Sequence, residues 1–320
     1  LGFAEMPGDF INAYVLGSMG STGPALGACA TFLYNLRLAV QDIRSGKARV
    51  AVVGAAEAPV VAEVMEGYAA MGALASDKAL RALDGLPENV RPDARRACRP
   101  FGENCGFTMS ESAQIMVLFD DDLALELGAP TLAAIPDVYV SADGPKKSIS
   151  GPGVGNYVTF AKSAALLKNL LGDRRFASGG VVQAHGTSTP QNRVTESQIM
   201  SEVAVALGVE QWTVGAIKSF IGHSLGAAAG DQLSAMLGVW ETGLMPGITT
   251  LDGVAADVAT DRLAFPLSTQ NVESPDYALI NSKGFGGNNA TAAVLGPDVT
   301  RELLAKHHGD RKLAVWERAH

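Results

Sequence analysis

The sequence predicts an α/β fold with a mostly parallel sheet covered by helices on both faces. Short apolar runs of strand length alternate along the chain with longer segments whose apolar residues recur at helix spacing. Hydrophobic residues make up 47% of the 320 residues and glycines number 36, which is typical of a packed α/β protein with many tight turns. The alternation divides near residue 130 into two successive α/β stretches, and no short fixed period repeats.

The first clear helix begins near Cys29 and ends before Gly46, because its apolar residues recur at helix spacing up to that glycine. Residues 48–54 form a short apolar run that predicts a strand buried on both faces. A second helix is expected over 58–74. Residues 77–97 then break the apolar pattern with many charges and two prolines, so we interpret them as a solvated surface excursion or insertion.

A further buried strand is expected over 114–119, and three carboxylates at 120–122 suit the first turn of a helix that runs to 127. Residues 131–140 have a strand-like pattern, and 141–156, rich in glycine, proline and serine, predict a long loop near a functional surface. The alternation then continues in this order: helix 157–171, strand 179–184, helix 194–207, strand 213–217, helix 224–241, strand 277–281 and strand 291–295.

Composition excludes several classes of function. The formal net charge of −8 comes without a basic stripe, so nucleic acid is a poor partner. No apolar run approaches the ~20 residues of a membrane span, and no signal-peptide pattern opens the chain. Three cysteines are too few and too irregularly spaced for a disulfide framework or a zinc site. A reducing, cytoplasmic location is the expectation that follows.

Cys29 has the context of a nucleophile at the start of a helix. The unpaired N–H groups and the positive end of the helix dipole are expected to favour its thiolate and lower its pKa. Its small neighbours Gly27, Ala28 and Ala30 leave room for a substrate carbonyl. A buried cysteine that only fills space between a strand and a helix remains the alternative.

Three strand ends carry further chemical groups. His185 follows an apolar strand and precedes a glycine and three hydroxyl residues, and His223 opens another helix after Gly222. Residues 281–289 form a glycine-rich turn whose free N–H groups suit an oxyanion or a phosphate. Each signal alone has a structural alternative, such as a hydrogen-bonded histidine or close helix packing. The glycine turn is neither a Walker loop nor a dinucleotide fingerprint.

Together these residues resemble the β-ketoacyl-acyl carrier protein synthases of the thiolase superfamily, in the class with a Cys-His-His active site. The order and rough spacing of the motifs follow that family from about residue 5 to residue 296. The matching blocks are Gly27–Thr31, Gly106-Phe107 with Glu111, His185–Pro190, Lys218 with Gly222–Ala228, and Asn281-Ser282 with Gly284–Gly287.

The resemblance implies a five-layered αβαβα fold of two related halves, usually assembled as a homodimer. Residues 1–130 would be the C-terminal part of the first half and carry the nucleophile, 131–297 would be the second half with both histidines, and 298–320 a C-terminal tail. The opening part of the first half is missing from this sequence. We expect it as another chain, a cleaved piece or protein outside this sequence, and we expect uncovered apolar faces where it would pack.

The resemblance also assigns roles to the motif residues. Cys29 would accept the acyl group, and His185 and His223 would serve decarboxylation and condensation, with Lys218 ordering the histidines. The backbone N–H groups of Cys29 and Phe285 would form the oxyanion hole, and the Phe285 side chain would be the gate between the acyl pocket and the malonyl side.

Further residues are implied to surround the substrate. Thr187 and Thr189 would hydrogen-bond the pantetheine arm, whereas Glu111 and Asn281 would be structural residues near the site. Gly284, Gly286 and Lys283 would also bind the substrate. The resemblance implies neither a metal nor a bound cofactor, because the acyl groups arrive on the phosphopantetheine of acyl carrier protein or on coenzyme A.

The sequence departs from the family pattern at several positions. Lys283 stands beside the gate where phenylalanine is usual, Asn288 replaces threonine, and Ala229 replaces glycine. Residues 143–150 do not resemble the usual segment, and 77–97 looks longer than usual. A buried ammonium needs a partner or water, so Lys283 is expected to have a carboxylate partner, with Glu111 the candidate, or a solvent-lined path. We hypothesise that Lys283 favours short or charged acyl donors.

The sequence therefore predicts an acyltransferase that loads Cys29 and condenses its acyl group with malonyl-acyl carrier protein in fatty acid biosynthesis, in elongation or in priming. A polyketide-type ketosynthase and a non-catalytic partner subunit of the chain-length-factor kind are the alternatives. Intact Cys29, His185 and His223 argue against the second. A degradative thiolase pairs one histidine with a second, late cysteine, and no cysteine follows Cys105.

Overall fold

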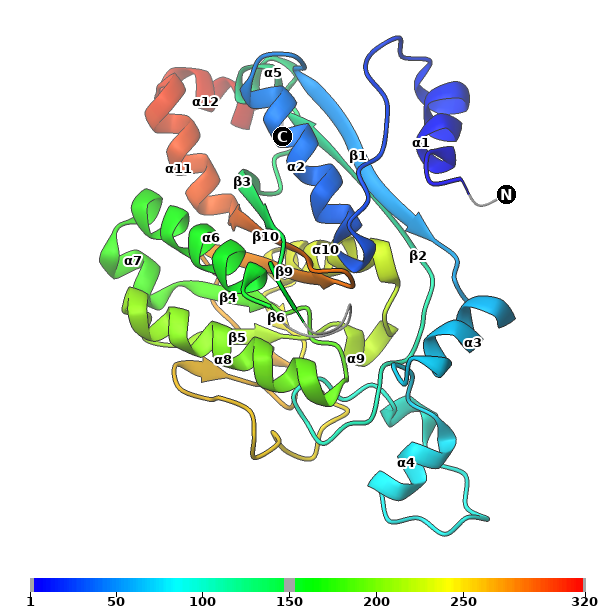
Figure 1. The fold of residues 1–320 in the computed structure, drawn as a ribbon. Helices are drawn as coiled ribbons and strands as arrows, with labels where there is room; N and C mark the ends of the chain where they lie inside the picture. Colours follow the sequence, from blue (N-terminus) through cyan, green and yellow to red (C-terminus); the bar gives the residue numbers. More distant parts are fainter. Residues whose placement is uncertain (1–2, 147–152, 319–320) are drawn as a thin grey trace.

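A six-stranded sheet forms the centre of the protein, in a computed structural model that describes residues 3–146 and 153–318 (Figure 1). The strands lie in the order β3-β10-β9-β4-β5-β7. Their bounds are Ala134–Ser141 (β3), Gly180–Gln183 (β4), Trp212–Gly215 (β5), Leu263–Ala264 (β7), Tyr277–Gly284 (β9) and Asn288–Leu295 (β10). Strands β9, β4, β5 and β7 pair in parallel, but β10 pairs antiparallel with both β9 and β3. The prediction of a mostly parallel sheet is therefore wrong for its β3-β10 side.

Helices cover both faces of this sheet, as predicted. Helices α2 (Thr31–Arg44) and α10 (Ala228–Thr242) lie on one face, and α6 (Gly155–Leu171) and α8 (Pro190–Leu207) on the other. Alternate residues of β9 point to opposite faces, so Ile280 packs with the α2 and α10 core and Leu279 with the α6 and α8 core. The sheet is thus buried on both sides.

A second, two-stranded sheet lies on the far side of α2 and α10 (Figure 1). It pairs β1 (Val50–Glu57) antiparallel with β2 (Ser112–Phe119). Its inner residues pack on the helices, but Val52 and Val117 on the outer face are 38% and 53% exposed. The predicted burial of these strands on both faces is wrong for the described chain, since no described element covers the outer face. The expected uncovered apolar face is observed here.

The two halves repeat one arrangement. In each half a short 3-10 helix leads into a long helix, an antiparallel strand pair and a further helix. The first half has Ala28–Ala30 (η2), α2, β1, β2 and Asp121–Leu127 (α5), and the second has Leu225–Ala227 (η4), α10, β9, β10 and Pro297–His308 (α11). Ala28 and Leu225, the first residues of the 3-10 helices, both have φ of 50°. This repetition supports the thiolase-like fold of two related halves.

The halves differ in the chain that joins their paired strands. Residues 285–287 join β9 to β10, whereas 58–111 join β1 to β2 and carry α3 (Ala62–Ala70), α4 (Asp77–Leu83) and η3 (Ala94–Arg96). Figure 1 shows α3 and α4 projecting from the body. Ser76 caps α4 by accepting the Ala79 N–H, and Leu80 is 2% exposed. The excursion expected over 77–97 is thus partly helical.

The remaining elements are short. They are α1 (Met6–Ile11), η1 (Asn12–Leu16), α7 (Asp173–Ser178), α9 (Lys218–Ile221), α12 (Asp310–Glu317), β6 (Leu244–Met245) and β8 (Gln270–Asn271). The segment expected to be a tail, 298–320, contains most of α11 and all of α12. Part of the long loop expected over 141–156 lies outside the described residues. Across the described ranges, no helix combines the length and apolar character that a membrane crossing requires.

Candidate active site

Cys29 lies in the 3-10 turn that leads into α2, and it is 4% exposed. The end of β9 is fastened to this turn, because Ser282 Oγ donates a hydrogen bond of 2.9 Å to the Cys29 carbonyl. Gly284 approaches the same loop so closely that a Cβ there would lie 2.2 Å from the Gly27 carbonyl oxygen. The glycine turn and the cysteine, far apart in sequence, therefore form one unit.

The two N–H groups expected to form the oxyanion hole are those that lower the pKa of the Cys29 thiol. The backbone N–H groups of Phe285 and Cys29 act on Sγ and, together with the Lys218 charge, lower the thiol pKa. Burial acts in the opposite direction and is the largest influence, so the pKa of Cys29 is raised to about 11. The expectation that the helix start keeps this residue a thiolate is wrong for the resting protein, because removal from water outweighs the local donors.

His185 and His223 are brought together although they follow different strands. Their ring centroids are 5.4 Å apart in an edge-to-face arrangement, and both side chains are almost fully buried. Phe107 links them to the cysteine, since it packs in one apolar cluster with Cys29 and lies 5.0 Å from the His223 ring centroid. Burial, reinforced by the Lys218 charge, holds the pKa of each histidine well below its usual value. Both imidazoles are therefore neutral at pH 7.

Lys218 lies at the centre of this group and is 1% exposed. Its Nζ donates a hydrogen bond of 2.6 Å to the His185 carbonyl, which fixes the backbone of that histidine. Burial lowers the pKa of Lys218, while the nearby carboxylates of Glu196 and Asp231 raise it. Through this contact Lys218 would order His185, whereas no hydrogen bond to His223 is observed among the described residues.

Glu196 is a residue that the sequence reasoning missed. Its carboxylate, fully buried on α8, accepts the N–H groups of His185 at 2.7 Å and Gly186 at 2.9 Å. It also accepts hydrogen bonds from the side-chain amides of Asn192 and Asn281. Asn281, expected to be structural, thereby joins β9 to the His185 turn. The signal in the sequence is that Glu196 lies four residues before Met200, so the predicted helix places this charged residue on the same face as an apolar one.

The residues expected to contact the pantetheine arm lie beside His185. The hydroxyls of Thr187 and Thr189 are 3.2 Å apart, and Thr189 is the more exposed of the two.

The gate candidate Phe285 is half-buried and stacks on Tyr68 with ring centroids 6.1 Å apart. Gly286 next to it is exposed and has φ of 86°, a left-handed conformation that favours glycine.

Lys283 does not pair with Glu111, so that part of the prediction is wrong. The exposed Glu111 accepts the Val60 N–H at 3.2 Å, whereas Lys283 Nζ donates a hydrogen bond of 2.9 Å to Thr195 Oγ1 on α8. The carboxylates of Glu196 and Asp143 raise the pKa of Lys283, but burial, the largest influence, lowers it. Alternation along β9 explains the difference, because residue 283 faces α8 and Ser282 faces Cys29.

The sequence matches two protein-family models. They are the N-terminal domain of β-ketoacyl synthases over residues 11–122 and the C-terminal domain of β-ketoacyl synthases over residues 132–252. The chain belongs to the β-ketoacyl synthase family. This confirms the resemblance found in the sequence motifs.

The chain matches different shares of the length of its relatives in this family. The β-ketoacyl-[acyl-carrier-protein] synthase FabY of Pseudomonas aeruginosa is 52% identical over 317 residues, which are 99% of this chain and 50% of the relative. The 3-oxoacyl-[acyl-carrier-protein] synthase 2 of Vibrio cholerae is 31% identical over 277 residues, 85% of this chain and 62% of the relative. The chain therefore spans about half the length of the FabY relative.

Solved structures of ketosynthases also match this chain. The crystal structure of the ketosynthase FabY from P. aeruginosa matches with a TM-score of 0.97 at 51% identity, over 100% of this chain and 50% of that one. An oxazolomycin ketosynthase domain from Streptomyces albus matches with a TM-score of 0.77 at 20% identity, over 92% of this chain and 50% of that one. The second match shows the fold alone, and both agree with the predicted thiolase-like architecture.

Proposed function

We propose that this chain carries the acyl-transfer and condensation site of a β-ketoacyl-acyl carrier protein synthase of fatty acid biosynthesis. The main support is the arrangement around Cys29. Its sulfur meets the N–H groups of Cys29 and Phe285, and two neutral imidazoles lie together beside the buried Lys218. This set of groups suits a thioester intermediate followed by an enolate, since amide donors stabilise an oxyanion and neutral histidines donate N–H bonds.

In the first step of the proposed reaction, Cys29 Sγ attacks the acyl thioester carbonyl, and the oxyanion accepts hydrogen bonds from the two N–H groups. The carbon–sulfur bond to the carrier breaks, and the carrier thiol leaves with the proton that Cys29 gives up. In the second step the malonyl thioester loses carbon dioxide. Its enolate, hydrogen-bonded by His185 and His223, attacks the acyl carbon and releases the Cys29 sulfur.

The proposed partners follow from this chemistry. The acyl and malonyl groups would arrive on the phosphopantetheine of acyl carrier protein or on coenzyme A, with Thr187 and Thr189 along the arm. A homodimer, completed by the part of the synthase outside this sequence, and a reducing cytoplasm that keeps Cys29 a free thiol fit the same proposal. A polyketide-type ketosynthase would use the same groups, so the acyl chain that is accepted distinguishes the two.

Intact-protein mass spectrometry after incubation with a panel of acyl thioesters tests the proposal. We expect the wild-type mass to rise by one acyl group, and Cys29→Ser to form no adduct while keeping its fold. Cys105→Ser is the matched control and should still be acylated. Acylation of Cys29→Ser at the wild-type rate would place the nucleophile elsewhere, and a wild-type protein that no thioester acylates would favour the non-catalytic partner subunit.

A further inference from the structure

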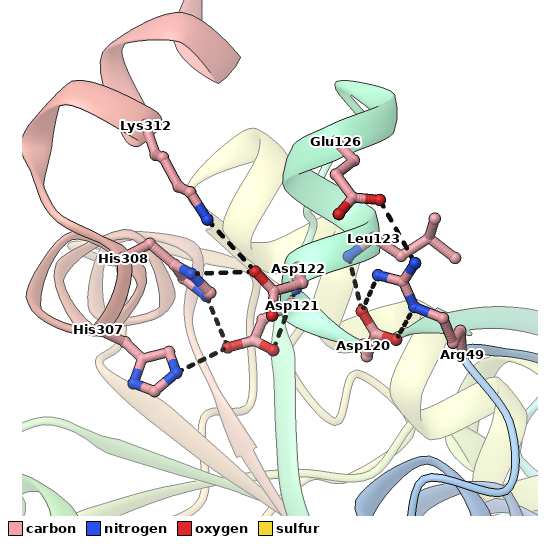
Figure 2. Close-up of polar contacts among 9 residues, drawn as sticks. All are labelled: Arg49, Asp120, Asp121, Asp122, Leu123, Glu126, His307, His308 and Lys312. Atoms are coloured by element: carbon pink, nitrogen blue, oxygen red, sulfur yellow. Dashed lines mark hydrogen bonds and ion pairs between the residues drawn. The ribbon is translucent and has the colours of Figure 1, made fainter.

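A group of histidine and aspartate side chains lies where α11 meets α5, outside the residues assigned to the reaction. Asp121 is in the first turn of α5, and His307 and His308 end α11 (Figure 2). One ligand atom from each of the three residues lies within 4.8 Å of the others. Residues from the two halves of the chain therefore offer two imidazole nitrogens and one carboxylate oxygen to the same point.

The contacts converge on a single oxygen. His308 Nε2 lies 2.8 Å from Asp121 Oδ2, and His307 Nε2 lies 3.9 Å from the same atom. The two rings are nearly perpendicular, with centroids 4.6 Å apart. Figure 2 shows the imidazoles approaching the carboxylate from different directions, as ligands of one ion would.

These separations suit a small divalent ion. Zinc binds histidine nitrogen and carboxylate oxygen at about 2.0–2.2 Å, so neighbouring ligand atoms in a tetrahedral shell lie roughly 3.3–3.5 Å apart. The observed distances of 2.8 Å and 3.9 Å lie on either side of this value. Asp121 and His307 are 48% and 73% exposed, so their side chains are free to turn toward a shared ion.

A second carboxylate supports the same interpretation. Asp122 Oδ1 lies 3.5 Å from His308 Nδ1, the ring nitrogen that does not face Asp121. A histidine that binds a metal through one nitrogen usually donates its other N–H to a carboxylate, which fixes the tautomer and the ring orientation. Lys312 Nζ lies 3.5 Å from the same Asp122 oxygen and holds that carboxylate in place.

The surrounding structure already holds the two helices in position. Leu304, Leu313 and Trp316 form a small apolar cluster against Leu125 of α5, and Trp316 Nε1 donates a hydrogen bond of 2.9 Å to the Ala129 carbonyl. The remaining acid of this turn, Asp120, is occupied by the Arg49 guanidinium, as Figure 2 shows. Asp121 and Asp122 thus face the histidines on a preformed framework.

We propose that Asp121, His307 and His308 bind one Zn²⁺ ion that clamps α11 to α5, with water completing its coordination. Imidazole and carboxylate ligands suit zinc among the divalent ions, whereas calcium and magnesium prefer all-oxygen sites. The metal has no part in the condensation. It adds a link between the C-terminal helices and the first half of the fold.

Calorimetric titration of the chelator-treated, reduced chain with zinc chloride tests the site. We expect one zinc per chain with a dissociation constant in the micromolar range. His307→Ala should weaken binding at least tenfold, and this side chain, 73% exposed, is removed without loss of packing. Asp122→Asn should weaken it by about 10–100-fold, the usual effect of losing such a carboxylate. Lys306→Ala, an exposed neighbour that offers no ligand, is the matched control and should bind normally.

Thermal stability distinguishes a zinc site from an Asp121–histidine ion pair that binds no metal. Zinc at a site formed by both helices stabilises the folded chain, so it should raise the Tm of the wild type and of Lys306→Ala more than that of His307→Ala. Cobalt(II) should give the visible spectrum of a nitrogen and oxygen site. No zinc binding by the wild type, or equal binding and equal Tm shifts for His307→Ala, would overturn the proposal.

Discussion

Burial dominates the chemistry of Cys29. The thiol has a pKa of about 11 because removal from water disfavours the thiolate more than Lys218 and the two N–H groups favour it. The protein therefore holds a neutral thiol and two neutral imidazoles at pH 7. Glu196 and Lys218 contribute by fixing the backbone of His185, since one accepts its N–H and the other donates to its carbonyl.

Alkylation of Cys29 by iodoacetamide should accelerate with pH far beyond neutrality. The thiolate is the reactive form, and a thiol with a pKa of about 11 stays mostly protonated below that pH. The rate should rise about tenfold per unit between roughly pH 7 and pH 10. Peptide mass spectrometry measures it site by site, with the less buried Cys105 as an internal comparison. A plateau below about pH 8 would contradict the burial argument.

Lys283 occupies a half-buried position between the gate and α8, where its charge also lowers the pKa of His185. If it favours short or charged acyl donors, Lys283→Phe should increase the rate with eight-carbon primers relative to two-carbon primers. Lys283→Met, which keeps the length and removes the charge, separates electrostatics from shape. Condensation rates for both primers in all three proteins are the measurement. An unchanged ratio would make Lys283 a structural substitution without a role in selectivity.

At the scale of elements, the decisive contact joins the β9–β10 turn to the loop before α2. Ser282 and Gly284 keep the β9–β10 turn close to the Cys29 loop, so the oxyanion hole proposed above would depend on two segments of the chain. The short turn of 285–287 allows this approach, whereas the corresponding strands of the first half are joined by the long excursion of 58–111. The repeat thus supplies the same framework twice, with different connections.

Gly284→Ala should disturb this contact. An added Cβ would lie 2.2 Å from the Gly27 carbonyl oxygen, so the turn must shift away from the nucleophile loop. We expect a loss of about 1–3 kcal/mol in the free energy of unfolding and slower acylation of Cys29. Gly67→Ala within α3 is the matched control, because its Cβ meets no atom within 4 Å. It should leave the acylation rate unchanged and raise the free energy of unfolding by about 0.5–1 kcal/mol, the usual gain when alanine replaces glycine in a helix. Chemical denaturation and acylation kinetics measure them; wild-type acylation by Gly284→Ala would show that the turn tolerates the shift.

At the scale of the molecule, the described residues form four layers, with the two-stranded sheet, α2 and α10, the six-stranded sheet, and α6 and α8 in succession (Figure 1). The outer face of the first layer presents a row of exposed valine and isoleucine side chains. Apolar surface of this kind usually packs against other protein. The five-layered fold that the resemblance implies would place a further layer of helices on this face.

The sequence by itself determined the alternation of strands and helices, the family, and the candidate residues Cys29, His185, His223 and Lys218. Local patterns carry this information, since helix spacing, apolar runs and residue motifs depend on neighbours in the chain. The antiparallel pairing of β10 was missed, because it depends on contacts distant in sequence. The helix α4 was missed within a charged segment, although Ser76 caps it locally.

Tertiary structure alone decided the protonation states and partners within the site. Three findings depend on which face of β9 or α8 meets which neighbour. They are the raised pKa of Cys29, the hydrogen bonds of Glu196 to the His185 turn, and the hydrogen bond of Lys283 to Thr195 rather than to Glu111. Burial and charge act through space, so a motif names the chemical groups without giving the balance between desolvation and hydrogen bonding. That balance is set only when the two halves of the chain pack around Cys29.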